Sequence, residues 1–169
     1  MKLSLYFIFF ILVFLSGPLL ADEASEWLKI EIDKILKAYE NESLSNEDRF
    51  LKIEDTINKN FAGAGIAKFV SGQSWQKTSK DIKKKYVKNF KRHLALNIAS
   101  MMQGYSNQKY ELSKTKIDNK NKVSLIDMEI FSDTGSVVVT WRVKKAQDRY
   151  FVIDLIVADI SLVVTKRSE

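Results

Sequence analysis

The sequence has 169 residues, of which 46% are hydrophobic, and a formal net charge of +6, which together fit one globular domain with a single core. It contains no cysteine and one histidine, His93, so disulfide scaffolds, thiol nucleophiles and most metal and catalytic constellations are excluded. The modest positive charge favours an anionic partner without identifying it.

Residues 1–21 have the layout of a secretory signal peptide. Lys2 precedes a nearly unbroken apolar run over residues 3–15, and Ala21 precedes the acidic pair Asp22 and Glu23. The run is shorter than the roughly 20 residues that span a bilayer. We therefore expect cleavage after Ala21, export to the periplasm and a mature domain over residues 22–169. Retention of the segment as an N-terminal anchor is the alternative.

The first half of the mature sequence has helical periodicity. Apolar residues recur at helical spacing in four stretches. The first covers residues 22–41, the second follows a capping signal at Ser45, the third is short and ends near Gly72, and the fourth runs from a start signal at Thr78 to Gly104. The last of these predicted helices is the longest and keeps one face apolar. Its opposite face is basic and carries Lys83, Lys84, Lys85, Lys88, Lys91 and Arg92.

The second half alternates apolar and polar residues with a period of two. Residues 109–117, 122–131, 136–145 and 149–165 predict four strands, and the short links between them predict an antiparallel meander. Helices followed by such a sheet make an α+β domain. We expect the helices to cover one face of the four-stranded sheet, in an NTF2-like or cone-like arrangement with an apolar pocket.

The segment Gly63-Ala64-Gly65-Ile66-Ala67-Lys68 imitates a phosphate-binding loop. A nucleotide loop follows a strand, whereas a helical pattern leads into this segment, and Lys68 is followed by Phe69 instead of Ser or Thr. We therefore expect these small residues to let a short helix approach its neighbour closely.

The remaining candidates for chemistry are single side chains. His93 is expected to be a half-buried packing residue on the long helix. Asp127, Glu129 and Asp154 are expected on the outer face of the sheet, although Asp154 or Asp127 would serve as the base of a small enzyme if it entered a pocket. The lysine run is either a solvated helix face or a surface for an anionic partner.

Two stretches resemble the MlaC family of periplasmic phospholipid-binding proteins, also labelled toluene-tolerance or ABC-transporter auxiliary proteins. They are FAGAGIAKFVSGQSW, starting at Phe61, and IDLIVADISLVVTKRSE, which ends at Glu169. Ala62 and Gly63 depart from the family pattern. The family continues beyond the last motif with further helices, so we expect either that this sequence is a fragment or that the domain lacks C-terminal helices that wall its pocket. The matching positions are Phe61, Phe69, Gly72, Trp75, Asp154, Ser161, Thr165 and Arg167.

The resemblance implies a monomeric, non-enzymatic periplasmic carrier with phospholipid as cargo and no cofactor, metal or nucleic acid. It would work between an outer-membrane lipoprotein complex and an inner-membrane ABC transporter with its substrate-binding subunit, and so maintain outer-membrane lipid asymmetry. The alternatives are a membrane-anchored interaction module and a small enzyme. An ordinary filled core is the other interpretation of the same apolar residues. The residues expected to line a lipid pocket are Phe90, Leu94, Ile98, Met101, Met102, Ile126, Met128, Val137, Val139, Trp141, Ile153 and Leu155.

Overall fold

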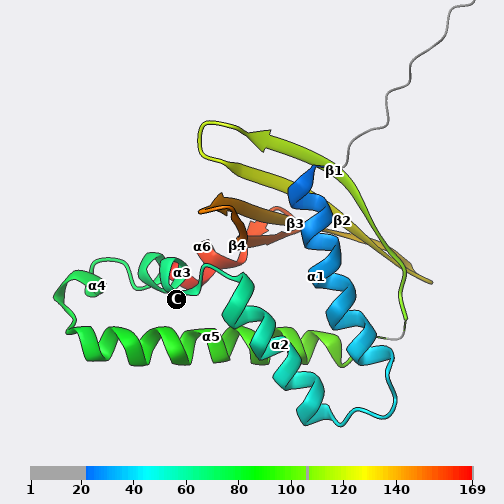
Figure 1. Cartoon of the computed structure of the whole chain (residues 1–169), viewed down its shortest axis with the longest axis horizontal. Coiled ribbons are helices and arrows are strands. Elements are labelled where there is room, and N and C mark those ends of the chain that lie inside the picture. Colours follow the sequence, from blue (N-terminus) through cyan, green and yellow to red (C-terminus); the bar gives the residue numbers. More distant parts are fainter. Residues whose placement is uncertain (1–21, 106, 169) are drawn as a thin grey trace, which may run out of the picture.

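Helices on one side of an antiparallel sheet make up the domain, as the computed structural model shows for residues 22–105 and 107–168 (Figure 1). The α+β prediction is confirmed, whereas the predicted signal segment lies outside the described residues. None of the helices described is long and apolar enough to cross a membrane. The elements are α1 (Glu23–Glu40), α2 (Asn46–Asn60), α3 (Gly63–Val70), α4 (Ser74–Lys77), α5 (Lys80–Met102), β1 (Tyr110–Asp118), β2 (Val123–Ser132), β3 (Gly135–Ala146), β4 (Arg149–Val157), β5 (Ile160–Ser161) and α6 (Leu162–Ser168).

The helices α2 and α5 begin at serine caps. Ser45 starts α2 with a capping box, in which its Oγ accepts the Asp48 backbone N–H (3.1 Å) and the Asp48 carboxylate accepts the Ser45 N–H (3.2 Å). The long helix α5 starts at Ser79, whose Oγ accepts the Ile82 N–H, and not at Thr78 as predicted. The Thr78 hydroxyl instead donates to the Ser74 carbonyl (2.6 Å), which closes the short helix α4.

The sheet has five antiparallel strands in the order β1-β2-β3-β4-β5, one more than predicted. The predicted strand over residues 149–165 is wrong after Val157. Ala158 and Asp159 have φ values of 48° and 63°, which an extended strand cannot contain, so the chain turns there. It then forms the two-residue strand β5 and the helix α6.

A bulge in β4 changes which side chains face the helices. Arg142 pairs with Asp154 and Val143 pairs with Val152, so Ile153 is an extra residue without a partner in β3. Simple alternation would place Ile153 and Leu155 on one face and Val152 on the other. Because Ile153 is an extra residue, Val152 and Leu155 instead face the same side of the sheet.

The helix α1 is tied to the sheet by polar contacts at its first turn. Glu23 accepts hydrogen bonds from Tyr150 (2.7 Å) and Lys145 (2.9 Å), which hold the pKa of Glu23 below its usual value. The hydroxyl groups of Ser25 in α1 and Thr115 in β1 form a further contact, with their oxygens 2.8 Å apart. These bonds set the distance between α1 and the strands. The side chains that are almost fully buried between helices and sheet are Leu28, Ile53, Ile57, Ile126, Val143 and Val152.

The core gives a matched pair of variants on α2. Ile57 is 1% exposed and Leu51 is 50% exposed. Ile57→Ala should lower the free energy of unfolding by about 3 kcal/mol, because it removes buried methyl groups and leaves a void. Leu51→Ala should change it by less than about 1 kcal/mol. Urea denaturation followed by circular dichroism measures both, and equal losses would contradict this view of the core.

Candidate functional site

A cavity of about 300 Å³ lies between the helices and the inner face of the sheet. That volume is at the lower end of the roughly 300 to 1,000 Å³ common for small-molecule sites. Its walls are mainly aliphatic and aromatic, so its chemistry suits an apolar ligand. The wall residues are Trp27, Leu28, Glu31, Ile32, Ile35, Leu36, Ile53, Thr56, Ile57, Asn60, Phe61, Phe90, Leu94, Asn97, Ile98, Met101, Met102, Tyr105, Gln108, Tyr110, Met128, Ile130, Val139, Trp141, Val152, Leu155, Val157, Leu162, Val163 and Lys166.

The C-terminal half of α5 forms one wall. Phe90, Leu94 and Ile98 are four residues apart, and Met101 and Met102 follow three and four residues after Ile98, which places all five on one side of the helix. Met101 is nevertheless 67% exposed, so this wall reaches the surface at its end. All five were predicted from the sequence to line the pocket.

The sheet forms the opposite wall. Of the sheet residues that the sequence analysis assigned to a lipid pocket, Met128, Val139, Trp141 and Leu155 are in the wall. Three other predicted residues are absent from the wall. Ile126 is wholly buried in the core, Val137 is 54% exposed near the β2–β3 hairpin, and Ile153 is the bulge residue.

Two sets of wall residues escaped the prediction. The first belongs to α1, where helical periodicity was recognised without being connected to a pocket. The second belongs to α6, where Leu162 and Val163 were assigned to a strand and Lys166 lies just after that predicted strand. The bulge adds Val152, which alternation had placed on the outer face.

Few polar groups reach the cavity, and most of them are engaged. Asn60 is buried and donates from Nδ2 to Glu31 Oε2 (2.6 Å). The Tyr110 hydroxyl donates to Asp33, and burial together with this carboxylate raises the pKa of Tyr110. The indole N–H of Trp141 is buried without an acceptor among the described residues. The cavity therefore offers hardly any charge to a ligand.

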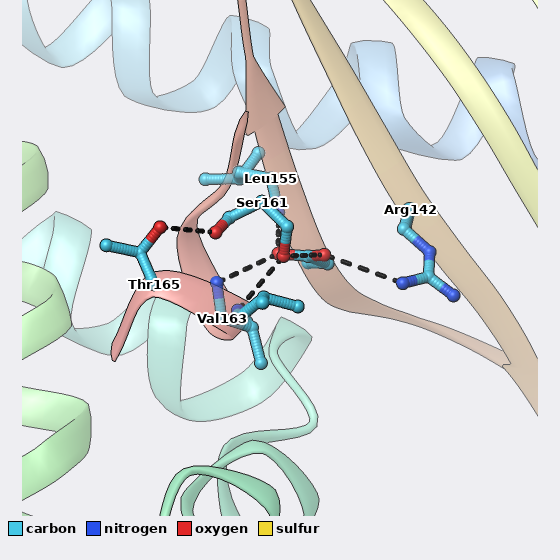
Figure 2. Close-up of polar contacts among 7 residues, drawn as sticks. Arg142, Leu155, Ser161, Val163 and Thr165 are labelled. Carbon is cyan, nitrogen blue, oxygen red and sulfur yellow. Dashed lines mark hydrogen bonds and ion pairs between the residues drawn. The ribbon is translucent and has the colours of Figure 1, made fainter. Parts of the chain in front are cut away.

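Asp154 lies beside this cavity but not in its wall. Asp154 is 3% exposed. Its carboxylate accepts hydrogen bonds from the Ser161 hydroxyl (2.6 Å) and from the backbone N–H groups of Leu155 (2.8 Å) and Val163 (3.2 Å). These contacts are drawn as dashed lines in Figure 2. Arg142 forms a longer ion pair with the same carboxylate (3.5 Å). Because it pairs with Arg142 in the ladder, Asp154 is on the strand face opposite Leu155.

The same network starts α6. The Ser161 hydroxyl accepts the Val164 N–H (3.0 Å), and the Thr165 hydroxyl donates to the Ser161 carbonyl (2.9 Å; Figure 2). Ser161 thus caps a helix of seven residues whose first turn includes Leu162 and Val163 of the cavity wall. The role that the contacts give Asp154 and Ser161 is to hold this wall in place.

The other matching positions connect distant parts of the chain. The Arg167 guanidinium lies 4.5 Å from the centroid of the Phe69 ring and donates to the Phe69 carbonyl (3.3 Å), which ties α6 to α3. Phe61 bridges to Val152 and is part of the cavity wall. Gly72 adopts a φ of 55° in the turn after α3, a conformation that glycine adopts without strain.

The remaining candidates lie away from the cavity. Trp75 stacks under Lys83 (5.4 Å), and Gly63 is in close approach to the Lys91 side chain, since an added Cβ would lie 2.4 Å from its Cε. Gly65 has open space around it. His93 is exposed and bonded to Asn97 (3.2 Å), so the expectation of a half-buried residue was wrong.

Asp127 and Glu129 were expected on the outer face of the sheet, and their contacts lie there. Asp127 accepts from the Thr140 hydroxyl (2.6 Å), and Glu129 accepts from the Ser136 hydroxyl. Neither is part of the cavity wall. Within the described part of the chain, no group of three or more acidic or histidine side chains is arranged as a metal site.

Comparisons with known proteins agree on a family and a fold. The family model described as MlaC protein matches residues 30–169. A solved structure of a phospholipid-binding protein from Ralstonia solanacearum, in complex with a phospholipid, is similar with a TM-score of 0.73 and 16% identity. The match covers 88% of this chain and 84% of that one. A search of curated proteins finds no match.

Replacing Asp154 should destabilise the fold more than replacing Asp127. Asp154→Ala leaves two backbone donors and the Ser161 hydroxyl without their shared acceptor. We expect a loss of about 3 kcal/mol in the free energy of unfolding. Asp127→Ala removes one bond to Thr140 and should cost about 1 kcal/mol. Chemical denaturation of both variants measures the difference, and a stable Asp154→Ala protein would refute the role of this network.

Proposed function

The chain belongs to the MlaC family, and from that premise we propose that it carries glycerophospholipid, with the lipid tails held in the cavity between helices and sheet. The observation that carries the proposal is the cavity itself, which is bounded mostly by apolar side chains from α1, α5 and the sheet. The similar structure from Ralstonia solanacearum contains a phospholipid, which supports the same class of cargo.

The energetics favour acyl chains in such a site. Each methylene moved from water to an apolar environment gains about 0.8 kcal/mol, so about a dozen methylenes gain on the order of 10 kcal/mol before any costs. Unassisted passage of a lipid through water is slow for the same reason. A carrier that shields the tails removes most of this barrier, and the mechanism requires partition of the tails without chemical catalysis.

The cavity must widen to accept two tails. At about 300 Å³ it is small for a diacyl lipid, and its α5 wall ends in Met101 and Met102. Methionine has a flexible, unbranched side chain that adapts to ligands of different shape. We propose that the lipid enters at this end of α5, with its headgroup left near solvent beside the exposed Asn97.

An enzymatic function has less support from the site. The base considered from the sequence, Asp154, is fully engaged in holding the first turn of α6, and neither Asp154 nor Asp127 is part of the cavity wall. A carrier needs neither carboxylate.

The cellular role follows from the family and belongs to the same proposal. The protein would work in the periplasm after removal of residues 1–21. It would receive and deliver phospholipid between an outer-membrane lipoprotein complex and an inner-membrane ABC transporter with its substrate-binding subunit, and thereby maintain outer-membrane lipid asymmetry. These partners are inferred from family membership.

The carrier proposal predicts bound lipid and its loss when the cavity is filled. Protein purified from a Gram-negative host should contain phospholipid by native mass spectrometry and by solvent extraction. Ile98→Trp adds a bulky ring to the α5 wall and should lower the lipid content at least tenfold, since the ring takes the space of the tails.

Leu96→Trp is the matched control. Leu96 lies on the same helix, is exposed and is not part of the wall, so this variant should retain lipid as the unmodified protein does. Circular dichroism and thermal melting establish that both variants fold. Consistently lipid-free protein, or equal lipid contents in the two variants, would contradict the carrier proposal.

A further inference from the structure

The N-terminal part of α5, with the end of α4, presents lysines that the fold does not use. We define the lysine face as Lys77, Lys80, Lys84, Lys85 and Lys88, all of which are exposed. Lys80, Lys84 and Lys88 are four residues apart and so form one stripe along the helix. Among the described residues, none of the five has an ion-pair or hydrogen-bond partner for its ammonium group.

The other cations of α5 differ because each has a partner within the protein. Lys83 lies over the Trp75 ring, the Lys91 ammonium donates to the Asn58 carbonyl (3.2 Å), and Arg92 pairs with Glu54 (3.0 Å). The lysine face therefore consists of the lysines in this region whose ammonium groups have no such partner among the described residues. Asp81 is the acidic residue within this stretch of α5, so the face is strongly positive.

The lysine face is separate from the cavity. The wall of the cavity uses α5 from Phe90 onward, whereas the lysine face uses residues 77–88. The N-terminal half of α5 runs past α3 and α4, on the side of the molecule away from the β1–β2 hairpin (Figure 1). Contact at the lysine face therefore leaves the walls of the cavity untouched.

The chemistry of the face fits a lipid surface better than a folded protein. Interfaces between proteins are depleted in lysine and rely on aromatic and arginine anchors, whereas every cation here is lysine. Flexible lysine side chains suit the diffuse negative potential of an anionic membrane. Trp75, two residues before Lys77 and in contact with Lys83, adds an aromatic group of the kind that lies at the headgroup boundary.

We propose that the lysine face is a docking surface for a bilayer that contains anionic phospholipid. The proposal goes beyond the carrier function, since it concerns where the protein meets a membrane and not what the cavity holds. Attraction of this kind is screened by salt and reversible, so the protein would bind and leave the surface readily.

The test is co-sedimentation of the full mature chain with vesicles. One set of vesicles is phosphatidylcholine with added phosphatidylglycerol, and the other is phosphatidylcholine alone. The protein should bind the anionic vesicles at low salt, bind the neutral ones weakly, and lose binding as salt increases. The variant Lys84→Glu/Lys85→Glu/Lys88→Glu should weaken binding to anionic vesicles at least tenfold, because each lysine near such a surface contributes about fivefold.

A charge-matched control uses lysines of β1, of β3 and of the turn between β1 and β2. Lys116, Lys120 and Lys144 are exposed, and the variant Lys116→Glu/Lys120→Glu/Lys144→Glu changes the net charge by the same amount. It should bind anionic vesicles within about threefold of the unmodified protein, apart from the small general effect of net charge. Circular dichroism establishes that both variants fold.

The outcomes separate this proposal from the carrier function. Unmodified protein that fails to bind anionic vesicles, or equal binding by the two triple variants, would overturn the docking surface, the latter pointing to net charge alone. Normal vesicle binding by the α5 variant, together with lost binding to an acidic protein, would assign the face to a protein partner instead. Lipid content is measured on the same preparations, and its absence would count against the carrier function alone.

Discussion

The placement of α6 depends on one buried carboxylate. Asp154 accepts hydrogen bonds from its own strand, from Ser161 after the turn and from the first turn of α6, so it joins three consecutive pieces of backbone at one point. A buried carboxylate is tolerated only where such donors surround it. The consequence reaches the cavity, because Leu162 and Val163 enter its wall only if α6 starts where Asp154 and Ser161 place it.

The bulge at Ile153 supports the same arrangement from within the strand. Val152 and Leu155 are three residues apart, yet both face the cavity, and the extra residue between them is what allows this. It also leaves Asp154 on the opposite face, where it pairs with Arg142 and meets the turn before α6. One irregularity therefore arranges an apolar wall on one side and a polar connection on the other.

The helix α5 combines two surfaces that differ in chemistry. Its C-terminal half is apolar towards the cavity, and its N-terminal half carries cations without partners in the described part of the chain. A helix is rigid over this distance, so the two surfaces keep a fixed relation to each other. For a carrier of lipid, such an arrangement keeps the site that holds the tails away from a surface that meets headgroups.

The periodicity of the sequence was enough to predict the α+β class, the capping box of α2 and the shared helix face of Phe90, Leu94 and Ile98, because each depends on residues close together in the chain. It did not reveal the bulge at Ile153, the helix α6 or the Asp154 network. An extra residue in a strand is defined by its neighbour strand. The helix α6 begins after two residues with left-handed backbone, Ala158 and Asp159, and is held by a carboxylate seven residues before Ser161, all within an apolar run that alternates like a strand. Whether the apolar residues form a filled core or surround a cavity was likewise decided only by the distances between elements, which no local pattern encodes.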